Sequence, residues 1–363
     1  MVWTSDSIRR IILDMAGRLG QSPPAGPIPP GRLDLGLDLG LTSIQRMELA
    51  AQLNEFFGIF HTDATNYLLA SPDLDHWIDC IRRARAQDNT YLTFRTSGST
   101  GQSRPIRHKL ADLETEVSFL ATLLPRPAQV LTTVPANHIY GFLFTVLLPA
   151  HWACPVRQLT ELGPAGITSD TLIVGTPFTW EYLYRSVLQR QPVACAGVCS
   201  TAPLPAALFT QLQQSGLTLT EIYGSSDTGG LAYRQQPTAP FTLFPYLDLG
   251  PGDAPAVSRN GTDVPLPDRI ERLSPRQFRV LGRLDQAVSI AGINVYPAHI
   301  RSVISACPLV DDCDIFAKAI DGRVQLFGAI RLRQLNAPNE AAARRWLRDR
   351  LSDAEIPTQL YFY

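Results

Sequence analysis

Apolar positions in the first part of the chain repeat with the spacing of amphipathic helices. Residues 8–19 carry apolar side chains every three or four positions, and a second helical stripe begins near Ser43. A third helical segment covers 74–84, and a Pro- and Gly-rich stretch at 21–31 separates the first two segments. The pattern predicts a small helical module that is joined to the rest of the chain by a linker near 84–93.

From residue 91 onward the pattern changes to short apolar runs typical of strands. Such runs occur at Tyr91–Phe94, at Phe278–Leu281 and at Val324–Ile330. The fold class we expect is multidomain, with an N-terminal helical bundle, an α/β core and a small α+β C-terminal lid. The predicted boundaries are 1–86 for the bundle, 87–282 for the core and 283–363 for the lid.

Six small residues, Thr96-Ser-Gly-Ser-Thr-Gly101, follow the first of these strands. Their hydroxyl and N–H groups could close around an oligophosphate, because glycine lets the backbone approach the ligand closely. The alternative is a plain Ser/Thr/Gly linker.

Composition narrows the functional classes only slightly. The chain has 363 residues, of which 45% are hydrophobic and 18% charged, and its net charge of -1 argues against nucleic-acid binding. Its six cysteines lack metal-ligand spacing, which favours reduced thiols in a cytoplasmic protein. No segment reads as a membrane span or a signal peptide. Lysine occurs only at positions 109 and 318.

The helical module resembles an acyl or peptidyl carrier protein. The resemblance rests on Asp38-Leu-Gly-Leu-Thr-Ser43-Ile44, followed by Glu48-Leu49 and Glu55-Phe-Phe-Gly-Ile59. It implies a four-helix carrier domain in which Ser43 holds 4'-phosphopantetheine, and a phosphopantetheinyl transferase as partner. The start of a helix suits a phosphodiester, since free N–H groups and the positive end of the macrodipole favour an anion there. The alternative is that Ser43 is only an N-cap.

The remainder resembles the adenylate-forming superfamily of acyl-CoA synthetases and adenylation domains. Four segments carry this resemblance after the small-residue run: Pro135–Phe142, Cys199–Leu204, Glu221–Gly230, and the pair of Asp268 with Gly282-Arg-Leu-Asp285. Asp268 stands fifteen positions before Arg283. A fifth segment, Ala291–Pro297, resembles the loop beside the thiol tunnel.

The resemblance implies ATP, Mg²⁺ and a small carboxylic acid as ligands, together with roles for individual residues. Asp227 would hold the metal, Tyr223 would stack on adenine, and Asp268 would accept the ribose hydroxyls. Asp227, Arg283 and His138 are the catalytic candidates, and Asp285 is the hinge between core and lid. The other implied contacts are Thr96, Ser97, Gly98, Ser99, Thr100, Gly101, Gly224 and Ser226 with the nucleotide, Gly292 with the pantetheine arm, and His138, Tyr140, Gly141 and Gly197 with the acid.

For His138, the resemblance places the imidazole at the carboxylate end of the acid pocket. The alternative is a buried histidine that is hydrogen-bonded to backbone. Aromatic and small residues around it favour a flat aromatic acid over a long-chain fatty acid.

Three departures from the superfamily pattern alter the expectation. Asp227 replaces a Glu, Ser289 replaces a Lys, and the Lys of the superfamily's last motif has no counterpart before Tyr363. Either the lid is truncated, or a different residue, such as one from a partner chain, completes the site. Without that cation we expect adenylation to lose more than thioester formation does.

The sequence thus predicts an AMP-forming acid–thiol ligase that loads a carrier. It is most similar to compact aryl-acid ligases of aryl-polyene and xanthomonadin-type secondary metabolism, for which polyketide or fatty-acid synthase components would be further partners. Two alternatives stay open. One is a catalytically degenerate module that docks a substrate or partner, and the other is a ligase that uses free CoA.

Overall fold

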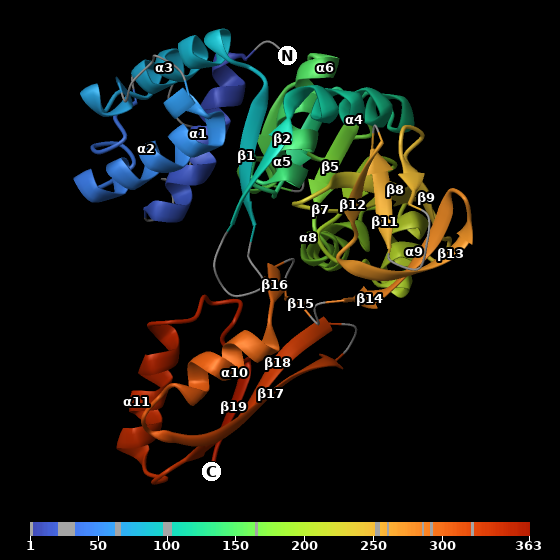
Figure 1. Ribbon diagram of the computed structural model, residues 1–363. Helices are drawn as coiled ribbons and strands as arrows, with labels where there is room; N and C mark the ends of the chain where they lie inside the picture. The colour runs from blue at the N-terminus through green and yellow to red at the C-terminus, as the bar shows by residue number, and fades with distance from the viewer. Residues whose placement is uncertain are drawn as a thin grey trace.

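The computed structural model (Figure 1) combines a helical N-terminal segment, an α/β body and a smaller C-terminal lobe, which lies below the body in this view. The residues that it describes are 3–20, 33–61, 67–96, 104–163, 166–250, 255–259, 261–284, 287–290, 293–320 and 323–363.

Within the described part of residues 3–87, three α-helices form the N-terminal segment: α1 (Ser5–Leu19), α2 (Ser43–Phe57) and α3 (Leu74–Gln87). Two short 3-10 turns, η1 (Ile59–His61) and η2 (Tyr67–Ala70), lie between the last two helices. The side chains of Thr4, Thr42 and Asp73 cap the helices by accepting a hydrogen bond from a first-turn N–H. The cap of α2 is therefore Thr42 and not Ser43. The interpretation of Ser43 as a simple N-cap is wrong.

The N-terminal helices and the body share one hydrophobic core. The ring of Trp3 lies 5.2 Å from that of Phe57 and 6.0 Å from that of Phe142, which belongs to helix α5 (Ile139–Phe142) of the body. Phe94 lies 5.1 Å from Phe56 and 5.4 Å from Phe142. All five aromatic side chains are buried in a single continuous cluster. The described part of residues 1–86 thus shares its core with the body, and the domain boundaries stay a prediction.

Polar contacts reinforce the junction between α1 and the body. The guanidinium of Arg10 donates to the carbonyl oxygen of Thr145, and the carboxylate of Asp14 accepts a 2.6 Å hydrogen bond from the N–H of Ala136. Burial raises the pKa of the Asp14 carboxyl. These groups tie the first helix to the segment that enters α5.

The predicted linker near 84–93 is not a flexible tether. Helix α3 continues to Gln87, and strand β1 (Tyr91–Thr96) begins after a short turn. The buried guanidinium of Arg85, which is 3% exposed, donates to the carbonyl oxygens of Phe57 (2.7 Å) and Tyr91 (2.9 Å) and to Oδ1 of Asn89. Asn89 Oδ1 also accepts from the indole N–H of Trp3 at 2.7 Å. This network holds the turn rigidly against both the helices and the body.

Strand β1 pairs antiparallel with β2 (Arg104–Lys109), and the hairpin lies beside α1–α3 in Figure 1. Helix α4 (Leu110–Leu123) follows directly. The described strands of the main sheet run in the order β13-β14-β9-β8-β7-β6-β5-β3-β4. Their bounds are β3 Gln129–Thr132, β4 Val156–Gln158, β5 Thr171–Gly175, β6 Ala196–Cys199, β7 Thr218–Ser225, β8 Gly229–Arg234, β9 Phe241–Leu243, β13 Asp268–Ser274 and β14 Gln277–Arg283.

Parallel pairing joins β4, β3, β5, β6 and β7, and the remaining strands are antiparallel. One face of the sheet packs on the core shared with the N-terminal helices, and the other packs on a second buried cluster. The further helical elements of the body are η3 (Leu143–Leu147), α6 (Leu148–Trp152), α7 (Leu159–Leu162), α8 (Pro177–Leu183), η5 (Tyr184–Leu188) and α9 (Ala206–Gln214), and a small sheet comprises β10 (Asp248–Leu249), β11 (Ala256–Arg259) and β12 (Thr262–Pro265).

The C-terminal lobe has its own buried cluster. Its elements are β15 (Val288–Ile290), β16 (Ile293–Val295), α10 (Pro297–Ser305), β17 (Val310–Ile320), β18 (Arg323–Leu332), α11 (Ala337–Arg348) and β19 (Gln359–Phe362). Strand β18 contains the predicted strand 324–330, and β14 contains the predicted strand 278–281. The α/β body and the small C-terminal lobe are therefore confirmed.

All six cysteines are free thiols, and five of them are buried. Among the described helices, none combines the length and the hydropathy that crossing a bilayer requires. The cellular compartment stays a prediction.

The Arg85 network predicts a selective loss of stability. We expect Arg85→Ala to lower the free energy of unfolding by about 2–4 kcal/mol, because it removes the guanidinium donor from the buried carbonyl oxygen of Phe57 and the partly buried one of Tyr91. Urea denaturation would measure this. The control is Arg82→Ala on the same helix, where an exposed guanidinium pairs with Asp79 at 2.6 Å and little change is expected. Equal effects of the two variants would contradict the role of Arg85.

Candidate active site

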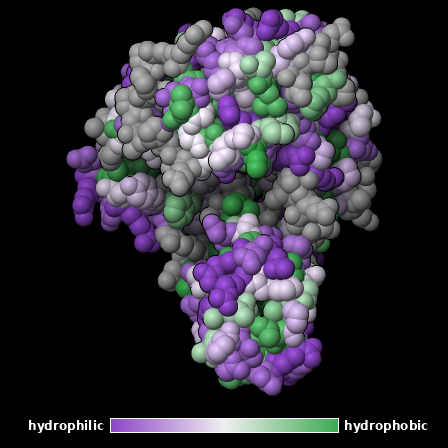
Figure 2. All heavy atoms as spheres, turned by 90° about the vertical axis from the view of Figure 1, so that its left-hand side faces the viewer, coloured by the Kyte–Doolittle hydropathy of each residue, from purple (hydrophilic) through white to green (hydrophobic). Residues whose placement is uncertain are grey.

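A cavity of about 2520 Å³ lies where the body meets the C-terminal lobe. The space-filling view shows a hollow at this junction (Figure 2). Its walls come from α5, from the carboxyl ends of the parallel strands, from the β7–β8 and β13–β14 hairpins, and from the lobe's β15 and β16. Ligands of open α/β sheets bind at the carboxyl ends of the strands, so this is the expected place for a site.

At one end of the cavity the structure brings together Tyr223, Asp268 and Arg283. The hydroxyl of Tyr223 donates to Oδ2 of Asp268 at 2.8 Å, and Nε of Arg283 lies 4.0 Å from Oδ1 of the same carboxylate. Asp268 and Arg283 face each other across the antiparallel β13–β14 pair. The fifteen positions that separate them in the sequence therefore span the two strands of one hairpin and its turn.

The ring of Tyr223 packs edge-on against Phe278, with centroids 5.4 Å apart, and at a tilt against Phe241, at 5.6 Å. Burial first, and then the Asp268 charge, raise the pKa of the Tyr223 phenol. The phenol therefore stays protonated and keeps donating to the carboxylate. Stacking of this ring on a base stays a prediction.

Asp227 lies in the turn between β7 and β8, where the guanidinium of Arg104 donates to its carboxylate. Close packing forms this turn, since a Cβ at Gly224 would lie 2.2 Å from the carbonyl oxygen of Gly229. His108 supports the turn from β2, with Nε2 2.8 Å from the carbonyl oxygen of Ser226. Burial lowers the pKa of His108, so a neutral ring with its proton on Nε2 donates this bond.

Several predicted contacts lie outside the described residues: Ser97, Gly98, Ser99, Thr100, Gly101, Asp285 and Gly292. Thr96 ends β1 and Arg104 begins β2, and these two residues pair across the hairpin. The structure thus places the first residue of the predicted phosphate loop, Thr96, and it places Arg104, which follows the loop in sequence, against Asp227.

Asp227 can hold Mg²⁺ only together with other ligands. No group of three or more candidate metal-ligating side chains occurs in the part of the chain that the structure describes. Mg²⁺ commonly binds through one or two carboxylates plus substrate phosphates. A single partly exposed carboxylate whose partner is the exposed side chain of Arg104 fits that kind of site.

At the other end of the cavity, Tyr140 forms part of the wall of the predicted acid pocket. Its hydroxyl donates to the carbonyl oxygens of Gly175 (2.9 Å) and Val198 (3.0 Å), so it braces two strands and is not directed at a ligand. Gly141 lets α5 pack closely, because a Cβ there would lie 1.9 Å from the carbonyl oxygen of Pro135. A row of hydroxyls, Thr133, Thr179 and Thr176, is linked by contacts of 2.7 and 3.3 Å between Oγ1 atoms.

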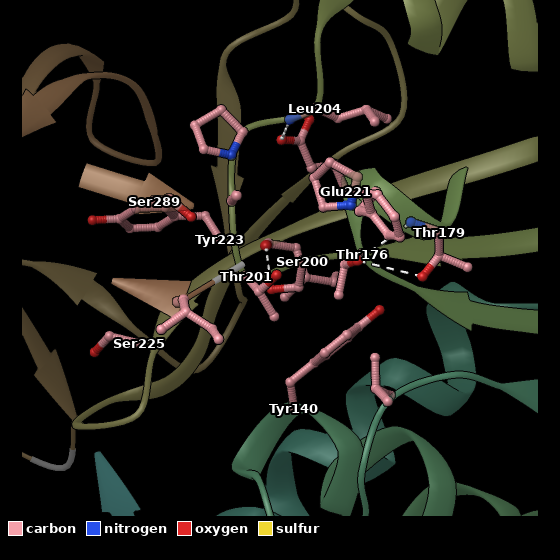
Figure 3. Close-up of a pocket in the computed structure, with 18 of the residues that line it drawn as sticks. Tyr140, Thr176, Thr179, Ser200, Thr201, Leu204, Glu221, Tyr223, Ser225 and Ser289 are labelled. Carbon is pink, nitrogen blue, oxygen red and sulfur yellow. Dashed lines mark hydrogen bonds between the residues drawn. The ribbon is translucent and has the colours of Figure 1, made fainter. Parts of the chain in front are cut away.

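Figure 3 places Tyr223 and Ser225 on one side of the cavity and Thr176 and Thr179 on the other, with Ser200 and Thr201 between them. The hydroxyl of Ser200 donates to the carbonyl oxygen of Ile222 at 2.9 Å. Thr201 is β-branched, yet its φ is 80°, a strained conformation of the sort found at functional sites. Glu221 fixes the loop that carries both residues, since its Oε1 accepts from the N–H of Leu204 at 3.0 Å.

The prediction for Gly197 is corrected. This residue is buried in β6 and does not line the cavity. A Cβ at position 197 would lie 2.5 Å from the indole of Trp180. Gly197 therefore serves packing between the sheet and α8.

The imidazole of His138 is exposed to the cavity and makes no hydrogen bond to any described residue. The alternative of a histidine held by backbone is therefore wrong. Loss of solvation and, next, the charge of Arg18 lower its pKa to about 4. The ring is neutral at pH 7, and its role in the reaction stays a prediction.

Sequence reasoning missed the buried carboxyl of Glu116. It lies on α4 behind the Asp227 turn, and its Oε1 accepts from the N–H of Gly230 at 2.9 Å. A Cβ at Gly229 or Gly230 would lie 2.8 or 2.3 Å from its oxygens, which explains the Gly-Gly pair. Burial raises the pKa of Glu116 to about 8. The sequence holds no signal for this contact, since 114 positions separate the two residues.

Comparison with known proteins shows which enzymes the chain is similar to. A 4-coumarate–CoA ligase from Rhodobacter capsulatus is 38% identical over 287 residues, which cover 75% of this chain and 74% of that protein. A second 4-coumarate–CoA ligase, from Halorhodospira halophila, is 33% identical over 359 residues, 92% of this chain and 88% of its own. A match of that extent must include at least part of the helical segment. No family model matches the chain.

Among solved structures, an o-succinylbenzoate CoA synthetase from Bacillus subtilis superposes with a TM-score of 0.62 at 14% identity. The match covers 75% of this chain and 65% of that one, so the chain spans just under two thirds of the neighbour's length. Fold and site together define an adenylate-forming enzyme fold with an α/β body and a small C-terminal domain. By sequence, the chain belongs to the adenylate-forming family of acid–thiol ligases.

The buried Glu116 predicts how stability changes with pH. Its folded-state pKa lies above the unfolded value, so between pH 4.5 and about 8 only the folded state keeps the proton. The free energy of unfolding should then fall as pH rises, by up to about 1.4 kcal/mol per pH unit. Glu116→Gln should flatten this slope in urea denaturation at pH 5.5 and 7.5. Glu114→Gln on the same helix serves as control, and an unchanged slope in Glu116→Gln would contradict the assignment.

Proposed function

We propose that the protein activates an aromatic carboxylic acid with ATP and transfers the acyl group to a pantetheine thiol. In the first step a carboxylate oxygen attacks the α-phosphorus and pyrophosphate leaves, giving an acyl-adenylate. In the second the thiol sulfur attacks the acyl carbon, AMP leaves and a thioester forms. The single observation that carries this proposal is one continuous cavity with the Tyr223–Asp268–Arg283 group at one end, the Tyr140–threonine wall at the other, and Asp227 among its lining residues.

The nucleotide half of this proposal assigns roles to residues already described. Asp268, with two carboxylate oxygens, would accept the ribose hydroxyls, and Tyr223 would contact the base. Gly224, Ser226 and the loop 96–101 would contact phosphate. Arg104 would move from Asp227 to a phosphate oxygen when Mg²⁺ arrives, since a guanidinium binds either anion well.

Mg²⁺ bound at Asp227 would neutralise phosphate charge during the displacement. The residues around it supply the alignment: Arg283 next to Asp268, and His138 at the acid. A neutral imidazole at pH 7 could donate or accept a hydrogen bond without repelling a nearby cation. Asp285 as hinge and Gly292 beside the thiol path complete the proposed set.

An aromatic acid suits the second end of the cavity. Phe144 lies 5.2 Å from the ring of Tyr140, and the Thr133–Thr179–Thr176 row provides hydroxyls for a polar ring substituent. Relatives named as 4-coumarate–CoA ligases support a phenolic acid of that kind.

CoA is the acceptor that we favour. A carrier must swing or move its arm to the site, whereas Arg85 and the shared aromatic core hold the helical segment against the body. The names of the relatives agree with CoA. A ligase with CoA needs neither a phosphopantetheinyl transferase nor synthase partners.

A specific observation keeps the carrier as a second candidate. Ser43 is exposed in the first turn of α2, and the neighbouring Ile44 and Met47 are 76% and 59% exposed. Such a position is accessible to a modifying enzyme. In that candidate Ser43 carries 4'-phosphopantetheine, and the chain loads the acyl group onto the thiol of that arm.

The first test is acid-dependent exchange between ATP and pyrophosphate. We expect wild-type protein to catalyse exchange with 4-coumarate or a related aryl acid, to fail with a long-chain fatty acid, and to form acyl-CoA when CoA is added. Asp227→Asn should slow the exchange roughly a hundredfold, as loss of a preorganised charged group does, and should raise the Mg²⁺ concentration needed for half-maximal rate.

Asp248→Asn is the matched control, because that carboxylate is 86% exposed and does not line the cavity. If wild-type protein binds ATP and acid but exchanges no pyrophosphate, the chain is the catalytically degenerate docking module instead.

The second test decides between acceptors. Wild-type protein incubated with a phosphopantetheinyl transferase and CoA should keep its intact mass if CoA itself is the acceptor. A gain of one phosphopantetheine group that is absent from Ser43→Ala would establish the carrier instead. Adding ATP and acid would then show whether the arm is loaded.

A further inference from the structure

The cavity is rich in arginine, and nearly all of that charge is locally compensated. Six arginines and no lysine line it in the part of the chain that the structure describes. Five of them pair with a carboxylate: Arg95 with Glu55, Arg104 with Asp227, Arg234 with Glu221, Arg279 with Glu271 and Arg283 with Asp268.

Arg18 is the exception. Its side chain is exposed to the cavity and makes no hydrogen bond or ion pair with any described residue. The charge of the Asp14 carboxylate, one turn earlier on α1, acts on the guanidinium of Arg18. That carboxylate already accepts a hydrogen bond of 2.6 Å from the N–H of Ala136. Surrounding protein lowers the pKa of Arg18, but the guanidinium stays charged at neutral pH.

Arg18 lies close enough to His138 for its charge to lower the pKa of that imidazole. Both side chains face the cavity, and α1 is held in place by the contacts of Arg10 and Asp14 with the segment 136–145. Helix α1 is therefore held at this end of the cavity, and Arg18 lines the cavity there near His138. A cation that is partly desolvated and has no carboxylate hydrogen-bonded to it favours binding of an anion.

We propose that Arg18 is a substrate-positioning residue whose guanidinium binds the carboxylate of the acid before adenylation. This inference rests on the proposed function and deepens it. The N-terminal helical segment would then supply part of the active site. Since no lysine lines the described cavity, Arg18 would also provide positive charge beside the reacting carboxylate, and the planar fork of a guanidinium matches the two oxygens of that group.

The carboxylate should depend on Arg18 more than the nucleotide does. Titration of the full chain with 4-coumarate and with its uncharged methyl ester separates charge recognition from recognition of the ring. We expect Arg18→Gln to weaken binding of the acid about tenfold to a hundredfold and to leave the ester unchanged. Arg18→Lys should retain part of the preference for the acid.

Kinetics and a matched control complete the test. In pyrophosphate exchange, Arg18→Gln should raise KM for the acid and leave KM for ATP unchanged. Arg9→Gln on the same helix should change neither, because Arg9 pairs with Asp75 outside the cavity. Melting temperatures of all variants would show that they fold.

Three results would overturn the proposal. An effect of Arg18→Gln on KM for ATP alone would mean that the guanidinium binds phosphate. Equal behaviour of Arg18→Gln and Arg9→Gln would mean that it binds neither. Failure of wild-type protein to bind or activate any aryl acid would remove the proposed function itself, and that outcome is visible before any variant is made.

Discussion

The aromatic cluster of Trp3, Phe56, Phe57, Phe94 and Phe142 is the contact on which the arrangement of the molecule depends. It joins helices from the start of the chain to α5, which lines the cavity where we propose that the acid binds. Because these rings are buried together, the first helix cannot shift without disturbing α5. The position of His138, and of the side chains that α1 presents to the cavity, follows from this packing.

Charge pairing organises the rest of the site. The carboxylate of Asp227 pairs with Arg104, and that of Asp268 pairs with Arg283. The charge of each carboxylate is therefore neutralised locally while no ligand is bound. In the proposed function, a nucleotide that enters would exchange these pairs for its own phosphates, metal and hydroxyls. Such exchange lowers the free-energy cost of binding, because few charged groups lose one partner without gaining another.

Much of the body could be predicted from sequence because the signals were local. The spacing of Asp268 and Arg283 is the length of a hairpin, and the apolar runs at 278–281 and 324–330 each became a strand. The turn Gly224–Gly229 was likewise marked by its glycines. Such features depend on near neighbours, where propensity and pattern are informative.

The errors involve contacts between distant residues. The polar stretch near 84–93 has the composition of a linker, yet Arg85 reaches carbonyls of Phe57 and Tyr91 that no local pattern reveals. Gly197 was assigned to a pocket wall, but the indole of Trp180 occupies the space beside it. Neither the buried Glu116 nor the cavity-facing Arg18 has a sequence signature, because burial and the absence of a partner are properties of the folded chain.

The same aromatic cluster determines when the N-terminal helices can finish folding. During synthesis, α1–α3 leave the ribosome before the residues that cover their apolar faces, and Phe142 emerges last of the group. Closing contacts between Trp3 and Phe142 requires ordering a long loop of intervening chain. The apolar faces that pack on Phe94 and Phe142 therefore stay uncovered in the nascent chain until those residues have been made.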